Sequence, residues 1–188
     1  MRFAQRPRFA RGPSIDQAIT APVLETERLT LRPHRIDDAA RWYEIQSSPD
    51  VYAYTSWPKR TEAQSRIHLK HRIKHIVLKQ ADDFLALAIE HEGELIGDVS
   101  LHLRSVAPSS RAAEISWILH PDHYGHGFAA EAAAAMMNFA FDRVNVQWLV
   151  AVVDAKNVAS VKLAKRLGFR QISQDGDSMS FVAGTFRP

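Results

Sequence analysis

The chain has 188 residues, a formal net charge of +3 at pH 7 and no cysteine. Its length suits one domain with a sizeable core, and the lack of cysteine excludes disulfides, thiolate nucleophiles and cysteine-ligated zinc. No apolar run approaches membrane-spanning length, and residues 1–22 lack the apolar core of a secretory signal, so we expect a soluble, cytoplasmic protein.

The excess positive charge lies at the N-terminus. Residues 1–22 hold five charged residues, namely Arg2, Arg6, Arg8, Arg11 and Asp16. The rest of the chain therefore carries 20 basic and 20 acidic residues. We predict a flexible basic arm over residues 1–22 and a single folded domain over residues 23–188. A transit peptide or a weak nucleic-acid contact are alternatives for the arm, but a neutral domain makes nucleic-acid binding an unfavoured function.

The first predicted elements of the domain are a strand and a helix. Leu29 and Leu31 alternate with polar neighbours, which is the period of a half-buried strand over residues 24–33. Asp37 or Asp38 can then cap a helix that runs to about residue 46.

Residues 47–58 form an irregular segment with two prolines and three aromatic side chains, Tyr52, Tyr54 and Trp57. These rings could line a substrate site or cover the core, and the sequence favours neither interpretation.

Thr61 and Gln64 match a capping box, which predicts a helix that runs to about residue 79. His68, His71 and His75 fall within a sector of about 60° on this helix, away from its apolar residues. Three imidazoles on one face could bind zinc, but a solvated polar face is the favoured interpretation.

A meander of three strands is predicted next. Residues 84–90 and 95–103 read as a hairpin closed by a turn with Gly93, residues 104–111 as a loop, and residues 113–119 as a third strand. This antiparallel arrangement delivers the chain to a glycine-containing loop.

That loop contains Gly125 and Gly127 and is followed by an alanine-rich helix over residues 131–142. Two glycines let the backbone turn tightly and leave its N–H groups uncovered near the positive end of the helix dipole, which makes a cradle for phosphate oxygens. The spacing fits neither the dinucleotide fingerprint nor the P-loop. A plain turn that starts the helix is the alternative.

The C-terminal part is predicted to be a buried strand, a helix and two strands. The strand covers residues 148–153, Asn157 caps a helix over residues 158–167, and the last strands cover residues 169–172 and 179–183.

Three separated stretches, in this order, resemble a known family. They are residues 27–33 (Glu-Arg-Leu-Thr-Leu-Arg-Pro), residues 114–131 with the glycine loop, and residues 157–169. The chain resembles the GNAT superfamily of N-acetyltransferases, and specifically its RimJ/RimL-like branch, which includes ribosomal-protein N-terminal acetyltransferases. The resemblance implies an α/β (α+β) fold whose mixed, mostly antiparallel sheet is splayed between its fourth and fifth strands and flanked by helices, with acetyl-coenzyme A in the V.

The resemblance also implies contacts with acetyl-coenzyme A. Main-chain groups of Ile118, Leu119 and His120 would bind the pantetheine arm, and the side chain of Asn157 would hydrogen-bond it. The pyrophosphate would be wrapped by Tyr124, Gly125, His126, Gly127, Phe128 and Ala129. His126 stands between the two glycines, where the family often has a basic residue. Because histidine is mostly uncharged at neutral pH and loses its remaining positive charge as the pH rises, we expect affinity for coenzyme A to weaken with rising pH.

The resemblance implies two candidate catalytic side chains. Glu114 is the carboxylate best placed to deprotonate the acceptor ammonium, because its strand runs beside the thioester in the family. An ordinary strand-edge charge, with a water chain as base, is the alternative. The family's usual tyrosine acid is absent from residues 161–167. Ser160, near the thioester sulfur, is therefore the candidate acid, and its alternative role is to satisfy a backbone group in the first helical turn.

Two further groups would complete the site. A main-chain N–H near Trp117 or Ile118 would polarise the thioester carbonyl. Asp98, on a neighbouring strand, would attract a cationic acceptor.

The expected function is direct transfer of an acetyl group from acetyl-coenzyme A to a primary amine in a ternary complex, because no cysteine can carry the group. No metal is expected. The acceptor would be a protein N-terminus, such as that of a ribosomal protein, or a small amine such as an aminoglycoside or polyamine. We expect a monomer or homodimer with no membrane contact. A non-catalytic acyl-coenzyme A sensor or scaffold is the alternative.

Overall fold

The structure is a computed structural model that describes residues 13–55 and 57–184. Its helices are α1 (Ala39–Ser47), α2 (Pro49–Tyr52), α3 (Glu62–Lys74), α4 (Phe128–Asp142) and α5 (Val158–Arg166). Its strands are β1 (Ser14–Thr20), β2 (Leu24–Glu25), β3 (Thr30–Pro33), β4 (Val77–Gln80), β5 (Phe84–His91), β6 (Glu94–Ser105), β7 (Ala112–Leu119), β8 (Trp148–Asp154), β9 (Arg170–Asp175) and β10 (Ser178–Gly184). Among the described residues, no helix is both long and apolar enough to cross a bilayer.

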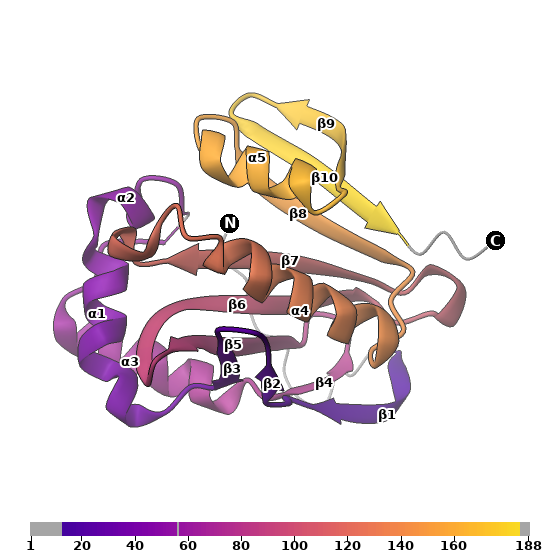
Figure 1. Cartoon of the computed structure of the whole chain (residues 1–188). Coiled ribbons are helices and arrows are strands. Elements are labelled where there is room, and N and C mark those ends of the chain that lie inside the picture. The colour runs from indigo at the N-terminus through magenta and orange to yellow at the C-terminus, as the bar shows by residue number, and fades with distance from the viewer. Residues whose placement is uncertain (1–12, 56, 185–188) are drawn as a thin grey trace.

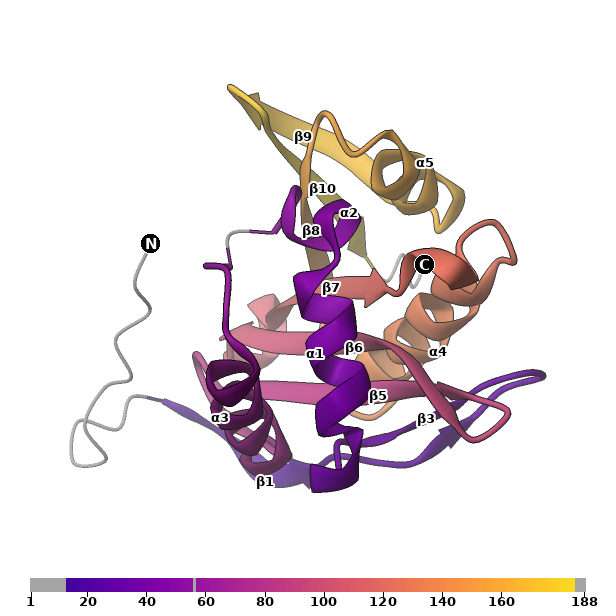
Figure 2. The ribbon, with the colours of Figure 1, turned by 90° about the vertical axis from the view of Figure 1, so that its left-hand side faces the viewer.

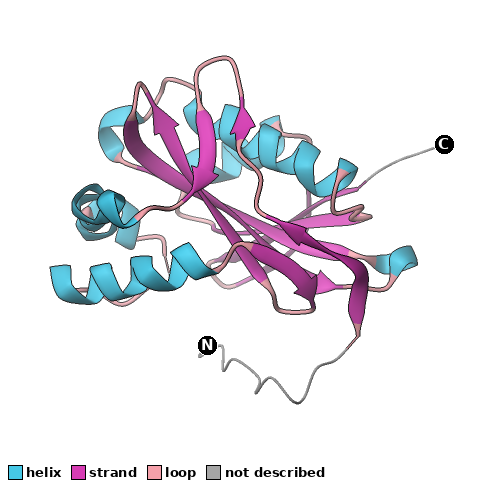
Figure 3. Cartoon of the chain, turned by 90° about the horizontal axis from the view of Figure 1, so that it is seen from below, coloured by secondary structure: helices cyan, strands magenta, loops and turns pink. Residues whose placement is uncertain are grey.

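One large sheet organises the molecule. Eight strands follow the order β2-β3-β5-β6-β7-β8-β10-β9, and β1 pairs with β4 in a separate two-stranded sheet. The β7–β8 pair is parallel, and the other neighbours are antiparallel. Helices α1 and α3 cover one face of the sheet and α4 covers the other (Figure 2), so that helices lie on both sides of the twisted strands (Figure 3). The predicted mostly antiparallel, helix-flanked sheet is confirmed.

The alternation of side chains along the strands creates two cores. Leu87 and Ile89 of β5 pack in the main core with Met136 of α4. Ala88, between them, faces the other side and packs with Trp42 of α1. Each large apolar side chain buried in this way contributes about 1.5–3 kcal/mol to the free energy of unfolding.

The predicted flexible arm is wrong for residues 14–20. These residues form β1, whose pairing with β4 includes Ile19 opposite Leu78. Ile15 is 3% exposed and Leu78 is fully buried, so this small sheet joins the main core. Residues 1–12 of the predicted arm lie outside the described residues.

Several element boundaries differ from the predictions. The single strand predicted over residues 24–33 is two strands, β2 and β3, that pair with each other. Helix α3 ends at Lys74 because residues 77–80 pair with β1 instead of continuing the helix. The segment predicted to be irregular contains the single-turn helix α2, which starts at Pro49, a residue suited to a first helical turn. Helix α4 begins at Phe128, three residues before the predicted start, because Gly127 takes the N-cap position with φ 82°.

Candidate active site

Strands β7 and β8 separate after a short paired region. Their parallel pairing covers three positions, from Ala112 opposite Trp148 to Glu114 opposite Val150. Beyond it, among the described residues, residues 115–119 pair with β6 alone and residues 151–154 pair with β10 alone. Figure 1 shows β8 leaving β7 toward α5. We call these two facing strand edges the split, and it confirms the splayed sheet expected for the fold.

Main-chain groups of β7 line one side of the split. The N–H of His120 donates to the carbonyl oxygen of Ile96 of β6 at 2.8 Å. Because main-chain groups alternate in direction along an antiparallel strand, Ile118 also points its N–H toward β6, whereas Trp117 and Leu119 point theirs into the split. Of the three residues predicted to offer main-chain groups to a pantetheine arm, Leu119 is therefore the one whose N–H faces the split.

The glycine loop lies where β7 leads into α4. Gly125 and Gly127 have φ values of 80° and 82°, which other residues rarely adopt. Helix α4 starts immediately afterwards, so its first N–H groups lack intrahelical partners. The structure thus brings Tyr124, Gly125, His126, Gly127, Phe128 and Ala129 together at one helix N-terminus.

Two aromatic residues of this loop have different environments. The side chain of Phe128 is 6% exposed and packs on the rings of His91 and His126, with centroids at 4.5 and 5.7 Å. Tyr124 stays exposed, although partial burial, with the nearby Asp50 and Tyr54, raises its pKa. Tyr124 is therefore the loop residue that lies near Asp50 of α2.

Sequence reasoning missed two charged residues at this loop. Arg28 donates from Nη1 to the carbonyl oxygen of His126 at 2.9 Å and pairs with Glu131 in the first turn of α4 at 2.6 Å. Arg28 belongs to the stretch that carries the family resemblance, but its partner is 103 positions away in sequence. No local pattern predicts such a contact.

Helix α5 presents two predicted residues opposite β7. Asn157 caps the helix, because its Oδ1 accepts the N–H of Ser160 at 3.0 Å. The Oγ of Ser160 accepts the indole N–H of Trp117 at 3.3 Å. The Trp117 side chain therefore joins β7 to α5 across the split, a role that the sequence did not predict. The Nδ2 group of Asn157 is not used by the cap.

Glu114 projects from the other face of β7. Its Oε2 accepts two hydrogen bonds from Arg104, at 3.1 Å from Nε and 2.7 Å from Nη2. Ser116, on the same face, shares a 2.7 Å hydrogen bond with Ser100. The two candidate catalytic residues therefore lie on opposite sides of β7, with Glu114 on the side of α1 and α3 and Ser160 on the side of α5.

The expected role of Asp98 in attracting a cationic acceptor is wrong. This carboxylate is 2% exposed and contacts His34 at 2.7 Å and Arg72 at 3.2 Å. Burial alone would raise the pKa of Asp98, but Arg72 and His34 lower it. A buried carboxylate with two such partners stabilises the packing of α3 on the sheet and is not available to a substrate.

The predicted solvated histidine face is wrong for His68. Its ring stacks on Trp42 with centroids at 5.9 Å, and its Nδ1 lies 2.9 Å from Nε2 of Gln46. His71 is exposed, whereas Nδ1 of His75 lies 2.6 Å from the carbonyl oxygen of His71. Among the described residues, no group of His, Asp and Glu is arranged to hold a metal ion.

Trp57 of the aromatic segment has one of the two predicted roles, and the exposed Tyr54 does not cover the core. Trp57 packs on Trp42 and His68, with centroids at 6.0 and 5.4 Å, and thus covers the second core. Tyr54 is 43% exposed, near the glycine loop residue Tyr124. Trp57 is therefore a lid over the core, and Tyr54 remains available at the edge of the site.

Comparison with known proteins agrees with this geometry. The acetyltransferase (GNAT) domain family matches residues 28–170. The uncharacterised N-acetyltransferase p20 of Bacillus licheniformis is 28% identical over 79% of this chain and 82% of its own. An acetyltransferase from Agrobacterium tumefaciens has a solved structure with 27% identity, a TM-score of 0.68, and coverage of 89% of this chain and 96% of its own.

The RimJ/RimL-like branch is also represented among similar structures. Mycobacterium smegmatis RimJ, solved with a coenzyme A disulfide, has 20% identity and a TM-score of 0.67, and covers 84% of this chain and 82% of its own. This likeness extends the shared fold to that branch. With the family match covering most of the chain and the split and glycine loop in place, the protein belongs to the GNAT family of acetyltransferases.

Proposed function

We propose that this acetyltransferase binds acetyl-coenzyme A in the split and transfers the acetyl group directly to a primary amine. The observation that carries the proposal is the donor surface formed by two separate stretches of main chain, the open edge of β7 and the glycine loop. The N–H groups of Trp117 and Leu119 face the split, and the loop that follows adds the N-terminus of α4. A thioester with an amide arm and a diphosphate matches these two kinds of donor in that order.

Each part of this surface binds a different part of acetyl-coenzyme A. The diphosphate lies on the N–H groups of residues 125–129, which include the two glycines, because the N–H of Tyr124 donates to the carbonyl oxygen of Pro121. The pantetheine amides pair with the main chain of β7, including Leu119, and Nδ2 of Asn157 donates from the facing helix. Ile118 and His120 then contribute mainly through position, because their N–H groups point to β6.

The transfer balances without a covalent enzyme intermediate. The neutral acceptor nitrogen attacks the thioester carbonyl carbon, and the C–S bond breaks as the tetrahedral intermediate collapses. Glu114 removes the proton from the acceptor ammonium directly or through a water. The main-chain N–H of Trp117 stabilises the oxyanion. Ser160 donates its proton to the departing thiolate and regains one from the nitrogen of the tetrahedral intermediate, which becomes the amide nitrogen. The chain has no cysteine that could carry the acetyl group.

We propose only the chemical class of the acceptor, which is a primary amine. A protein N-terminus, which includes that of a ribosomal protein, and a small amine both present a primary amine to the Glu114 side of β7. We propose a monomer or homodimer that acts in the cytoplasm. Residues 1–12, with most of the basic arm, lie outside the described residues, so any ribosome contact is tested by deleting them.

Calorimetric titration with acetyl-coenzyme A tests donor binding. Gly127→Trp places a large side chain in the glycine loop and should abolish binding. Gly168→Trp is the matched control, because Gly168 also has a left-handed φ, 85°, and lies just after α5, away from the loop. Wild-type protein that folds but binds no acetyl-coenzyme A would contradict the proposal.

An acceptor screen by mass spectrometry tests transfer. It compares peptide N-termini with aminoglycosides and polyamines, and a mass increase of one acetyl group identifies the product. We expect Glu114→Gln and Ser160→Ala to reduce kcat while acetyl-coenzyme A still binds. Full activity in both variants would refute these catalytic roles, and binding without any acetylated acceptor would favour an acyl-coenzyme A sensor.

A further inference from the structure

Glu131, in the first turn of α4, is held by the turn between β2 and β3. Its Oε1 accepts hydrogen bonds from Oγ1 of Thr26 at 2.6 Å and from the main-chain N–H of Arg28 at 2.8 Å. Its Oε2 accepts from Nε of Arg28 at 2.8 Å and pairs with Nη2 at 2.6 Å. Both carboxylate oxygens are therefore occupied by residues from a segment about one hundred positions earlier.

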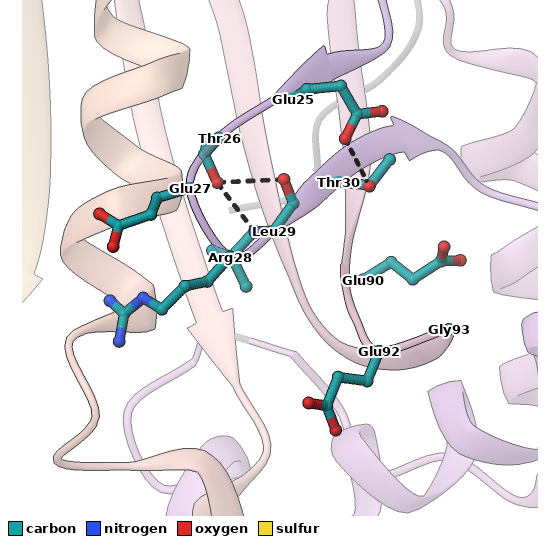
Figure 4. Close-up of a pocket in the computed structure, with 9 residues that line it drawn as sticks. All are labelled: Glu25, Thr26, Glu27, Arg28, Leu29, Thr30, Glu90, Glu92 and Gly93. Carbon is teal, nitrogen blue, oxygen red and sulfur yellow. Dashed lines mark hydrogen bonds between the residues drawn. The ribbon is translucent and has the colours of Figure 1, made fainter.

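The guanidinium of Arg28 also lies against the glycine loop. Its Nη1 donates to the carbonyl oxygen of His126 at 2.9 Å, and its Cζ lies 4.8 Å from the centre of the Phe128 ring. A Cβ on Gly127 would be 3.5 Å from Nη2. Figure 4 shows the Arg28 side chain extending toward α4, whereas Glu92 of the neighbouring hairpin points away from it.

These bonds fix the direction of the loop amides. In a trans peptide unit the C=O and N–H point in opposite directions. Because Arg28 binds the carbonyl oxygen of His126, the N–H of Gly127 must point away from Arg28. The carbonyl oxygen of Gly127 accepts the N–H of Glu131 at 3.1 Å, which fixes the next peptide unit in the same way. Glycine has the largest conformational freedom of any residue, so an unrestrained loop would lose the most entropy on binding.

We propose that Thr26, Arg28 and Glu131 form a brace that positions the glycine loop to receive the diphosphate of the acetyl donor. The inference rests on the proposed function and adds three positioning residues that do not touch the reacting atoms. The brace has an electrostatic part as well. A carboxylate in the first turn of α4 would repel a diphosphate if it were unpaired, and Arg28 neutralises it.

Two acetyl donors, one with and one without a diphosphate, distinguish a specific effect of the brace on diphosphate binding from a general loss of stability. Arg28→Ala should raise KM for acetyl-coenzyme A about tenfold or more, which corresponds to ~1.4 kcal/mol for each factor of ten, with kcat changed less than twofold. Acetyl-pantetheine lacks the diphosphate, so its KM should change less than twofold. Arg66→Ala, at an exposed arginine of α3, is the matched control.

The electrostatic part predicts a partial rescue. Arg28→Ala leaves the Glu131 charge next to the diphosphate, whereas the double variant Arg28→Ala/Glu131→Gln removes that charge. We therefore expect the double variant to bind acetyl-coenzyme A more tightly than Arg28→Ala alone. Thr26→Val removes one hydrogen bond to Glu131 and the two bonds of Oγ1 with the main chain of Leu29. It should raise KM for acetyl-coenzyme A less than Arg28→Ala does.

Hydrogen–deuterium exchange tests the positioning role in the ligand-free protein. Arg28→Ala should accelerate exchange in peptides that cover residues 124–131, and peptides from β5 and β6 should be unchanged. Unchanged loop exchange, or an equal rise in KM for both donors, would overturn the brace. Wild-type protein that binds no acetyl-coenzyme A would overturn the proposed function and the brace together, whereas wild-type binding that Arg28→Ala leaves intact would overturn the brace alone.

Discussion

Acid should destabilise this protein through two half-buried histidines. Burial, together with the positive charges of Arg72 and Arg60, lowers the pKa of His68 to about 3. Burial, with Arg104 and Arg72, lowers the pKa of His102 to about 4. In the unfolded chain both imidazoles regain a pKa of about 6.5. Between these values the unfolded state binds more protons than the folded state, so the free energy of unfolding must fall as the pH falls from 6.5 toward 4.

The size of the effect follows from the two pKa values of His68. At pH 5 the unfolded imidazole is almost fully protonated and the folded one is neutral, which gives a difference of about 2 kcal/mol relative to pH 7.5. His102 adds a similar amount by the same relation. Because both rings retain some contact with solvent, we expect about 1 kcal/mol from each.

Urea unfolding at pH 7.5 and pH 5 measures this difference directly. His68→Asn keeps a hydrogen-bond acceptor for Gln46 but cannot be protonated in this range. The variant loses ring stacking on Trp42 at both pH values. The informative quantity is therefore the decrease in the free energy of unfolding from pH 7.5 to pH 5. We expect that decrease to be about 1 kcal/mol smaller than in the wild type. His71→Asn, at an exposed site on the same helix, should show the same decrease in the free energy of unfolding between the two pH values as the wild type. An equal loss in His68→Asn and wild type would refute the reasoning.

Three other changes test the sheet and the donor site. In Gly97→Ala the new Cβ would collide with the carbonyl oxygen of Ile118, so we expect a loss of about 1–3 kcal/mol and a raised KM for acetyl-coenzyme A; unchanged kinetics would argue against this edge as the donor site. Asp98→Ala leaves Arg72 buried without its carboxylate, and a loss of about 3–5 kcal/mol in urea unfolding is expected, whereas a loss below about 1 kcal/mol would contradict the ion pair. Asn157→Asp keeps the helix cap but removes the Nδ2 donor, so Tm should stay constant while KM for acetyl-coenzyme A rises severalfold; Asn157→Ala should also lose about 1 kcal/mol of stability.

The glycine loop could be predicted from the sequence because its determinants are local. Gly125 and Gly127 were predicted to let the backbone turn tightly, and both have positive φ values. Strand, loop and helix follow each other in the predicted order. Asn157 was likewise a recognisable cap, since its bond to Ser160 spans three residues.

Helix α3 shows where the apolar pattern fails. Its buried positions are Ser65, Leu69 and Arg72, whereas Ile67 is 57% exposed. Two of the three buried side chains are polar because partners outside the helix satisfy them. Ser65 donates to Gln46 at 2.7 Å and Arg72 pairs with Asp98. Hydrophobicity alone therefore does not identify the buried face of this helix, although Ile73 does pack against the second core.

Strands β1 and β4 were missed for a related reason. Each finds its pairing partner in the other, more than fifty residues away in the chain. Neither stretch alternates polar and apolar residues strongly enough to predict a strand by itself. The same limit applies to the contact between Arg28 and Glu131, whose residue types were visible but whose proximity depends on the packing of β3 and α4.

The arrangement of β7 explains why its register matters for the proposed reaction. Its edge presents the N–H groups of Trp117 and Leu119 to the split, while side chains alternate between the Glu114 face and the Ser160 face. One strand thus separates the proposed base for the acceptor from the proposed acid for the acetyl donor. Because the side-chain period is two, a slip of one residue against β6 would exchange the two faces and turn the free N–H groups inward. The close approach of Gly97 to the β7 main chain is specific to the present register, which makes that glycine a structural requirement of the site.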